Sequence, residues 1–197
     1  MQRRNLLLAL LLLALAGGMF LVRAFFGAFN PPHPLAGIYP AAANPLPALQ
    51  VTFADPAWDG RTIPVGQNCR RFQGHGDTPP LQVEGIPAGA NAVLIEFHDE
   101  SFRAMKNGGH GIVGYRTTGP SVRVPAIPGE TVDGLPPGAF IEVPHRGGDY
   151  GGPGYLPPCS GGSGNLYTIT VKAVFKSDTD PAANKLLAQT RMDIGRY

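Results

Sequence analysis

Charged residues are scarce in this chain, because Asp, Glu, Lys and Arg make up 15% of its 197 residues and leave a net charge of +2. The basic residues are scattered along the sequence, so the stripe that binding to a nucleic-acid backbone requires is missing. The chain also lacks an internal repeat and the motifs GxSxG, HExxH, CxxC and the P-loop. These absences argue against nucleic-acid binding and against the familiar types of catalysis.

Glycine and proline are abundant instead, with 27 Gly and 21 Pro in a chain of ordinary hydrophobic content, 43%. This composition predicts many turns and short strands rather than long helices. The length suits one domain, since about 150 residues remain for a core once the N-terminal segment is set aside.

Residues 1–29 form a membrane-directed segment. Two arginines, Arg3 and Arg4, precede the uncharged run LLLALLLLALAGGMFLV at 6–22, which predicts either a signal peptide or a transmembrane anchor. The apolar residues that follow Ala16 favour the uncleaved anchor, with its N-terminus in the cytoplasm. We therefore expect a membrane-attached protein whose remaining chain lies outside the cytoplasm, or a periplasmic or secreted protein if the segment is cleaved.

The remainder divides into a linker and a domain. Residues 30–50 carry six prolines without sustained periodicity and predict a semi-rigid, unfolded stalk. Residues 51–197 are expected to form the folded domain. This domain holds the two cysteines, Cys69 and Cys159, and in an exported chain they are compatible either with one disulfide or with two separate thiols.

The domain is predicted to be all-β and similar to a β-sandwich, with one helix near the C-terminus. Short β-rich runs lie at 51–53, 92–98, 111–116, 122–127 and 139–144. The clearest strand is LYTITVKAVF at 166–175, in which apolar residues alternate with mixed ones. Asp180 and Pro181 are typical of a helix start, and the following AANKLLAQTRM predicts the helix.

Several polar side chains fall at predicted strand ends. Because residues two apart project from the same face of a strand, His98 and Glu100 share a face and Asp99 points away. His110 opens the next β run, and Asn165 and Tyr167 share a face where the clearest strand begins. Taken singly, each has a structural explanation, and for Tyr167 core packing is the favoured role.

Residues 51–197 resemble the phosphatidylethanolamine-binding protein family in its bacterial Raf-kinase-inhibitor-like branch. The matching stretches are FADPAWDGRTIPVGQNC at 53–69, TPPLQVEGIPAGANAVLIEF at 78–97, PPCSG at 157–161 and GRY at 195–197. The family's His-Trp pair falls on His110 and Gly111, and its His-x-Tyr falls on Asn165 to Tyr167. The chain departs from the family where two acidic positions become His98 and Glu100.

The resemblance implies a large antiparallel sheet packed by a smaller one, with an anion-accepting pocket at one end. It implies that His98, Glu100, His110, Pro158, Asn165 and Tyr167 bind the ligand. Pro158 would stiffen the pocket wall, and the glycines of SGGSG at 160–164 would let backbone N–H groups approach the ligand. Both cysteines fall near this pocket, which favours the disulfide between Cys69 and Cys159.

We therefore expect a non-enzymatic binding protein, without cofactor, for a small anion such as a phosphate or phospholipid headgroup. Protonation of His98 and His110 below about pH 6.5 is expected to strengthen binding. One alternative is an inhibitor or interaction protein of the cell envelope with a degenerate pocket. A second is a metal-dependent hydrolase that uses His98, Glu100 and His110 as ligands.

Overall fold

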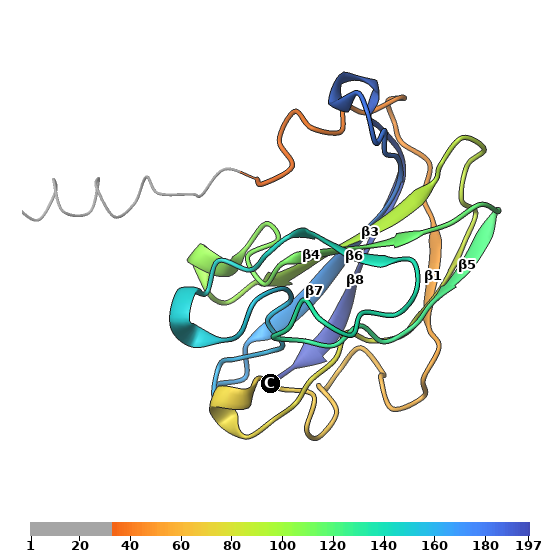
Figure 1. Cartoon of the computed structure of the whole chain (residues 1–197). Coiled ribbons are helices and arrows are strands. Elements are labelled where there is room, and N and C mark those ends of the chain that lie inside the picture. The colour runs from red at the N-terminus through yellow and green to blue at the C-terminus, as the bar shows by residue number, and fades with distance from the viewer. Residues whose placement is uncertain (1–32) are drawn as a thin grey trace, which may run out of the picture. The chain divides into compact units, whose positions relative to one another are not determined.

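The computed structural model describes residues 33–197, and short strands dominate it (Figure 1). One sheet has three strands in the order β1 (Gln50–Phe53), β2 (Leu81–Glu84) and β5 (Ser121–Val124). The other has five strands in the order β6 (Ala139–Val143), β4 (Ile112–Arg116), β3 (Ala92–Asp99), β7 (Leu166–Phe175) and β8 (Lys185–Arg196). All pairings within both sheets are antiparallel. The predicted all-β class, with a larger and a smaller sheet, is confirmed.

The connections contain four 3-10 helices of one turn each. They are η1 (Arg70–Phe72), η2 (Arg103–Met105), η3 (Gly148–Tyr150) and η4 (Pro181–Ala183). The first three lie on the same side of the molecule, at the left in Figure 1. That is also the side at which β3 ends and β7 begins.

The main hydrophobic core fills the space between the two sheets. From the five-stranded sheet, Val93, Ile95 and Phe97 of β3 enter it beside Ile169 and Val171 of β7. Leu81, Val83 and Val124 contribute from the smaller sheet, and all three are fully buried. We call this side of the five-stranded sheet its inner face.

The opposite, outer face is covered by residues 33–49. Leu35 and Tyr39 pack there against Ala92, Leu94 and Val174. The same segment hydrogen-bonds along the free edge of β8, where Ala42 N donates to Leu186 O and Gln189 N donates to Pro47 O. Its prolines suit an extended path that pairs at an edge. Residues 33–49 are thus part of the folded domain, which differs from the expected stalk.

The predicted C-terminal helix is wrong. Asp180 does accept a hydrogen bond from Ala182 N, but η4 is a single turn and the chain continues as β8. Residues 185–196 pair with the whole length of β7. Leu186, Ala188 and Ile194 are buried while Gln189 and Arg191 are exposed, which is strand alternation. Pairing with a ten-residue strand outweighs the helix propensity of Ala, Leu, Lys and Gln.

The signal or anchor segment expected at 1–29 lies outside the described residues. Within residues 33–197, no helix has both the length and the apolar character to cross a bilayer. These described residues belong to one compact unit with its own hydrophobic cores and disulfide. The unit therefore contains what a domain needs to fold on its own.

Candidate ligand-binding pocket

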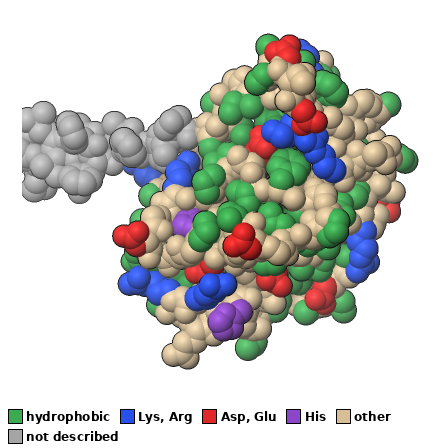
Figure 2. All heavy atoms as spheres, in the orientation of Figure 1, with side chains coloured by type: hydrophobic (Ala, Val, Ile, Leu, Met, Phe, Trp, Pro, Cys, Tyr) green, Lys and Arg blue, Asp and Glu red, His purple; other side chains and the backbone are tan. Residues whose placement is uncertain are grey.

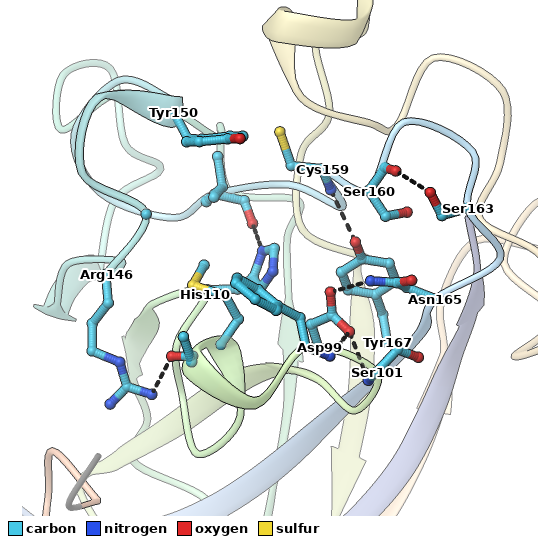
Figure 3. Close-up of a pocket in the computed structure, with 15 residues that line it drawn as sticks. Asp99, Ser101, His110, Arg146, Tyr150, Cys159, Ser160, Ser163, Asn165 and Tyr167 are labelled. Atoms are coloured by element: carbon cyan, nitrogen blue, oxygen red, sulfur yellow. Dashed lines mark hydrogen bonds between the residues drawn. The ribbon is translucent and has the colours of Figure 1, made fainter. Parts of the chain in front are cut away.

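A cavity of about 570 Å³ opens where β3 ends and β7 begins (Figure 3). The antiparallel register places Asp99, the last residue of β3, opposite Tyr167. Its polar lining comprises Asp99, Ser101, His110, Arg146, Ser160, Ser163, Asn165 and Tyr167. Its other lining residues include Phe102, Ala104, Met105, Tyr150, Leu156 and Cys159. The cavity thus combines a hydrogen-bonding end with a largely apolar wall.

Asp99 supplies the carboxylate of the pocket although it is only 3% exposed. Its Oδ1 accepts hydrogen bonds from the backbone N–H groups of Ser101, at 2.8 Å, and Phe102, at 3.0 Å. Its Oδ2 accepts a hydrogen bond of 2.6 Å from Asn165 Nδ2. These donors fix the carboxylate in one orientation and compensate its burial.

His110 is buried as a neutral imidazole. Its Nδ1 lies 2.8 Å from the carbonyl oxygen of Leu156, so Nδ1 carries the hydrogen and donates it. Burial lowers the pKa of His110 to about 4, against the opposing effects of the Leu156 carbonyl and of Asp99. In this tautomer Nε2 is a hydrogen-bond acceptor. A group that meets Nε2 must therefore bring a donor.

Tyr167 lies beside His110, with the two ring centroids 5.2 Å apart and the planes at 89°. The phenolic oxygen accepts a hydrogen bond of 3.1 Å from Cys159 N. Burial, together with the negative charge of Asp99, raises the pKa of Tyr167 to about 12. The hydroxyl keeps its proton at neutral pH and can act as a donor.

A disulfide joins Cys159, which lines the pocket, to Cys69, 90 residues away in the sequence. The predicted disulfide is confirmed. Backbone hydrogen bonds reinforce it: Cys69 N donates to Pro158 O at 3.1 Å, and Leu156 N donates to His110 O at 2.9 Å. Pro158 itself is buried behind the wall and does not line the cavity. Its part is to hold the loop that carries Cys159.

The glycine-rich loop 160–164 closes one side of the pocket. Gly161, Gly162 and Gly164 have φ values of 66°, 80° and 78°, which residues with a Cβ rarely adopt. Ser163 Oγ donates to Ser160 O, and Ser160 Oγ donates to Tyr197 O, both at 2.7 Å. The glycines allow the tight loop that brings both serines to the cavity.

His98 and Glu100 do not join this pocket. They project to the outer face, where His98 lines a second cavity of about 400 Å³ together with His33, Glu96, Thr170 and Lys172. Glu100 accepts hydrogen bonds from Thr168 Oγ1 and Arg191 Nη2. The expected convergence of His98 and Glu100 with His110 is therefore wrong. Strand alternation gives the reason: adjacent residues of β3 face opposite sides.

Asp99 was expected to point away from the site, because the sequence of β3 does not mark which of its two faces is inner. Val93, Ile95 and Phe97 all face the inner core, and Asp99 continues the same series of odd-numbered positions. The three side chains expected to hold a metal are divided between the two faces. Within the described part of the chain, no group of three His, Cys, Asp or Glu residues is placed to hold a metal ion.

The fold and pocket are those of an all-β domain with a hydrogen-bonded cavity at the end of its larger sheet. No family model and no curated protein matches the chain. Among solved structures, it is similar to a phosphatidylethanolamine-binding protein homologue from Chlamydia trachomatis, with 22% identity over 76% of this chain and 97% of that one, and a TM-score of 0.46. It is also similar to Escherichia coli YbcL, described as a member of the mammalian family, with 22% identity over 75% and 98% and a TM-score of 0.47. Both carry the family name that the sequence resemblance gave.

Proposed function

We propose that this protein is an exported, non-enzymatic binding protein for a small amphiphile with a phosphate-type head. The observation that carries the proposal is the polarity of the cavity, in which Asp99, His110 and Tyr167 form a buried polar end. Phe102, Met105 and Leu156 provide the apolar wall beside it. A pocket of this kind holds an apolar ligand body and fixes its orientation through a few polar groups.

The buried polar end favours a head that both donates and accepts hydrogen bonds. Asp99 and the Nε2 atom of His110 are acceptors, whereas Tyr167 O–H is a donor. A singly protonated phosphate monoester meets this demand, since its P–OH donates and its remaining oxygens accept. A dianion would bring unrelieved repulsion toward Asp99 in a site that is largely shielded from water.

Binding rather than catalysis is supported by the serine hydroxyls of the pocket. Ser160 and Ser163 donate to backbone carbonyls, and the Nδ1 of His110 is committed to Leu156. None of these hydrogen bonds links a serine to His110, as an activated nucleophile would require. Export is supported by the disulfide, which persists in oxidising compartments, and by the apolar run at 6–22.

Because His98 and His110 are buried, protonation of their side chains does not supply the tighter anion binding that was expected at acidic pH. Burial lowers the pKa of both His98 and His110 to about 4, so neither gains a proton between pH 7.5 and 5.5. A preference for acidic pH must then come from the ligand, because the second pKa of a phosphate monoester is about 6.

Calorimetry on residues 33–197 tests this proposal with phosphorylethanolamine, a monoester, and glycerophosphoethanolamine, a diester. We expect tighter monoester binding at pH 5.5 than at 7.5, and no pH preference for the diester. Asp99→Asn should remove the pH preference of the monoester, and Gln189→Ala on the outer face should preserve it. Absence of binding by both compounds, or an unchanged preference in Asp99→Asn, would contradict the proposal.

A further inference from the structure

The three single-turn helices η1, η2 and η3 surround the mouth of the pocket, and each brings an exposed aromatic side chain. The exposed fractions are 39% for Phe72, 56% for Phe102 and 52% for Tyr150. Phe102 and Tyr150 line the mouth directly. The ring of Phe72 packs against the glycine loop. It lies so close to Gly161 that a Cβ atom at this position would be 3.0 Å from the ring. Water-exposed aromatic rings grouped around one opening mark an interaction surface.

Basic side chains accompany these aromatic residues. We define the rim as residues 70–72, 102–106 and 146–150, and these 13 residues contain five Lys or Arg and one Asp. Two of the five basic residues form ion pairs with carboxylates outside the rim, Arg70 with Glu130 and Lys106 with Glu100. The whole chain has 16 basic and 14 acidic residues. Charges that are scattered in the sequence are therefore gathered by the fold. Figure 2 shows blue side chains on this side of the molecule, with red ones among them.

The rim is held together by its own contacts. The guanidinium carbon of Arg71 lies 4.2 Å from the centroid of the Tyr150 ring, which joins η1 to η3. Arg146 Nη2 donates to the carbonyl oxygens of Ala104 and Lys106, which joins the η3 segment to η2. The rim is thus one connected surface rather than three independent loops.

We propose that this rim docks the domain on an anionic lipid bilayer. Exposed aromatic rings suit the interface between water and the acyl chains, and basic side chains suit acidic headgroups. Charge complementarity therefore favours an anionic surface, and the apolar segment at 6–22 is expected to keep the domain near a membrane. Docking would place the mouth of the pocket against the bilayer. An amphiphile could then pass from the bilayer into the pocket without crossing water. The docking stands independently of the ligand that the pocket holds.

Flotation with vesicles tests the proposal on residues 33–197, so that the apolar segment does not contribute. Vesicles of phosphatidylcholine alone are compared with vesicles that contain about one third phosphatidylglycerol. We expect binding only to the mixed vesicles, weakened by raising the salt from 0.1 to 0.5 M, because salt screens exposed charges. Arg71→Gln should reduce partitioning about fivefold, and Phe102→Ser about fivefold to tenfold.

Matched control variants lie far from the rim. Phe175→Ser changes a ring that is 37% exposed at the other end of β7, about 30 Å along the strand. Arg123→Gln removes an exposed charge from β5. Both should bind vesicles as the unmodified domain does. Equal losses in the control and rim variants, or equal binding to both vesicle types, would overturn the proposal.

Further comparisons separate this proposal from the proposed ligand. Asp99→Asn should leave vesicle binding unchanged, and Arg71→Gln, at a rim residue that does not line the pocket, should leave the affinity for phosphorylethanolamine within about threefold. Failure of the ligand test alone would therefore not affect the docking surface. Absence of vesicle binding together with rim-dependent binding to polyglutamate would assign the rim to an acidic protein instead and overturn membrane docking.

Discussion

The two faces of the five-stranded sheet solve the burial of polar groups in different ways. On the inner face, Asp99 is held by backbone and amide donors. On the outer face, Glu96 forms an ion pair with Lys172, whose Nζ lies 2.6 Å from its Oε1, and a hydrogen bond with His33, whose Nε2 lies 3.1 Å from its Oε2. The inner arrangement leaves acceptors for a ligand, whereas the outer arrangement pairs its charges with one another.

The outer cluster also ties the N-terminal segment to the sheet. His33 belongs to the segment 33–49, and Glu96 lies in the middle of β3. Burial opposes ionisation, but the His33 hydrogen bond and the charge of Lys172 hold the pKa of Glu96 below its ordinary value. Buried charge on the outer face joins residues 33–49 to the sheet, whereas buried polarity on the inner face lies at a cavity, where the proposed function would use it.

The largest expected effect comes from removing the outer carboxylate. Glu96→Ala leaves Lys172, whose side chain is 12% exposed, without its partner, and should cost about 3–5 kcal/mol of unfolding free energy. Urea denaturation measures this loss. Asp178→Asn is the control, since its ion pair with Arg116 is exposed and should contribute less than about 1 kcal/mol. A loss below 1 kcal/mol in Glu96→Ala would mean that the outer ion pair does not stabilise the fold.

Removing the disulfide should act on both stability and binding. We expect the double variant Cys69→Ser, Cys159→Ser to lose about 2–5 kcal/mol, because the bond closes a long loop. It should also weaken ligand binding, since Cys159 N–H orients the hydroxyl of Tyr167. Calorimetry under conditions where the variant stays folded checks this. Glu96→Ala should keep its affinity, so equal losses of affinity in both variants would erase the distinction between the faces.

The sequence predicted the sheets well because the strands are locally encoded. The run at 166–175 alternates, and it forms β7 with the predicted bounds. Residues 182–192 have residues that favour helix, yet β8 forms because β7 offers a full-length partner. That pairing spans a turn and depends on tertiary contact, which a local reading of propensity does not include.

The pocket was harder to predict because apolar and polar residues do not alternate along β3. All eight residues of β3 are buried, since the core covers one face and residues 33–49 cover the other. Leu94 and Ile95 are therefore both apolar, and the sequence gives no sign of which face is inner. Without that information, His98 and Asp99 could not be assigned correctly. His110 and Tyr167 were found because the family resemblance singled them out.

Acid should destabilise both faces through their histidines. Burial lowers the pKa of His98 and of His110 to about 4, below the value of about 6.5 in an unfolded chain. The unfolded state then binds more protons, so this stability is complete above pH 6.5 and is lost as the pH falls toward 4. We expect a loss of about 1–3 kcal/mol per histidine between pH 6.5 and 4.5.

Denaturation at several pH values measures this dependence, and His98→Gln and His110→Gln should each remove about half of the histidine contribution. Proton NMR of the imidazoles adds a direct check, because both should titrate near pH 4. A titration midpoint near 6.5 for either residue would show that its ring is hydrated in the folded protein. In that case the faces would differ in solvation as well as in charge.

The smallest effects are expected from single neutral hydrogen bonds, one on each face. Thr170→Val removes the partner 2.9 Å from His98 Nε2, and Tyr167→Phe removes the acceptor of Cys159 N–H. Each should cost about 1 kcal/mol, and only Tyr167→Phe should weaken ligand binding. Because the two bonds share no partner, their costs in unfolding free energy should add within about 0.5 kcal/mol in the double variant. A larger deviation would mean that β3, whose adjacent residues His98 and Asp99 face the two sites, couples the outer cluster to the pocket.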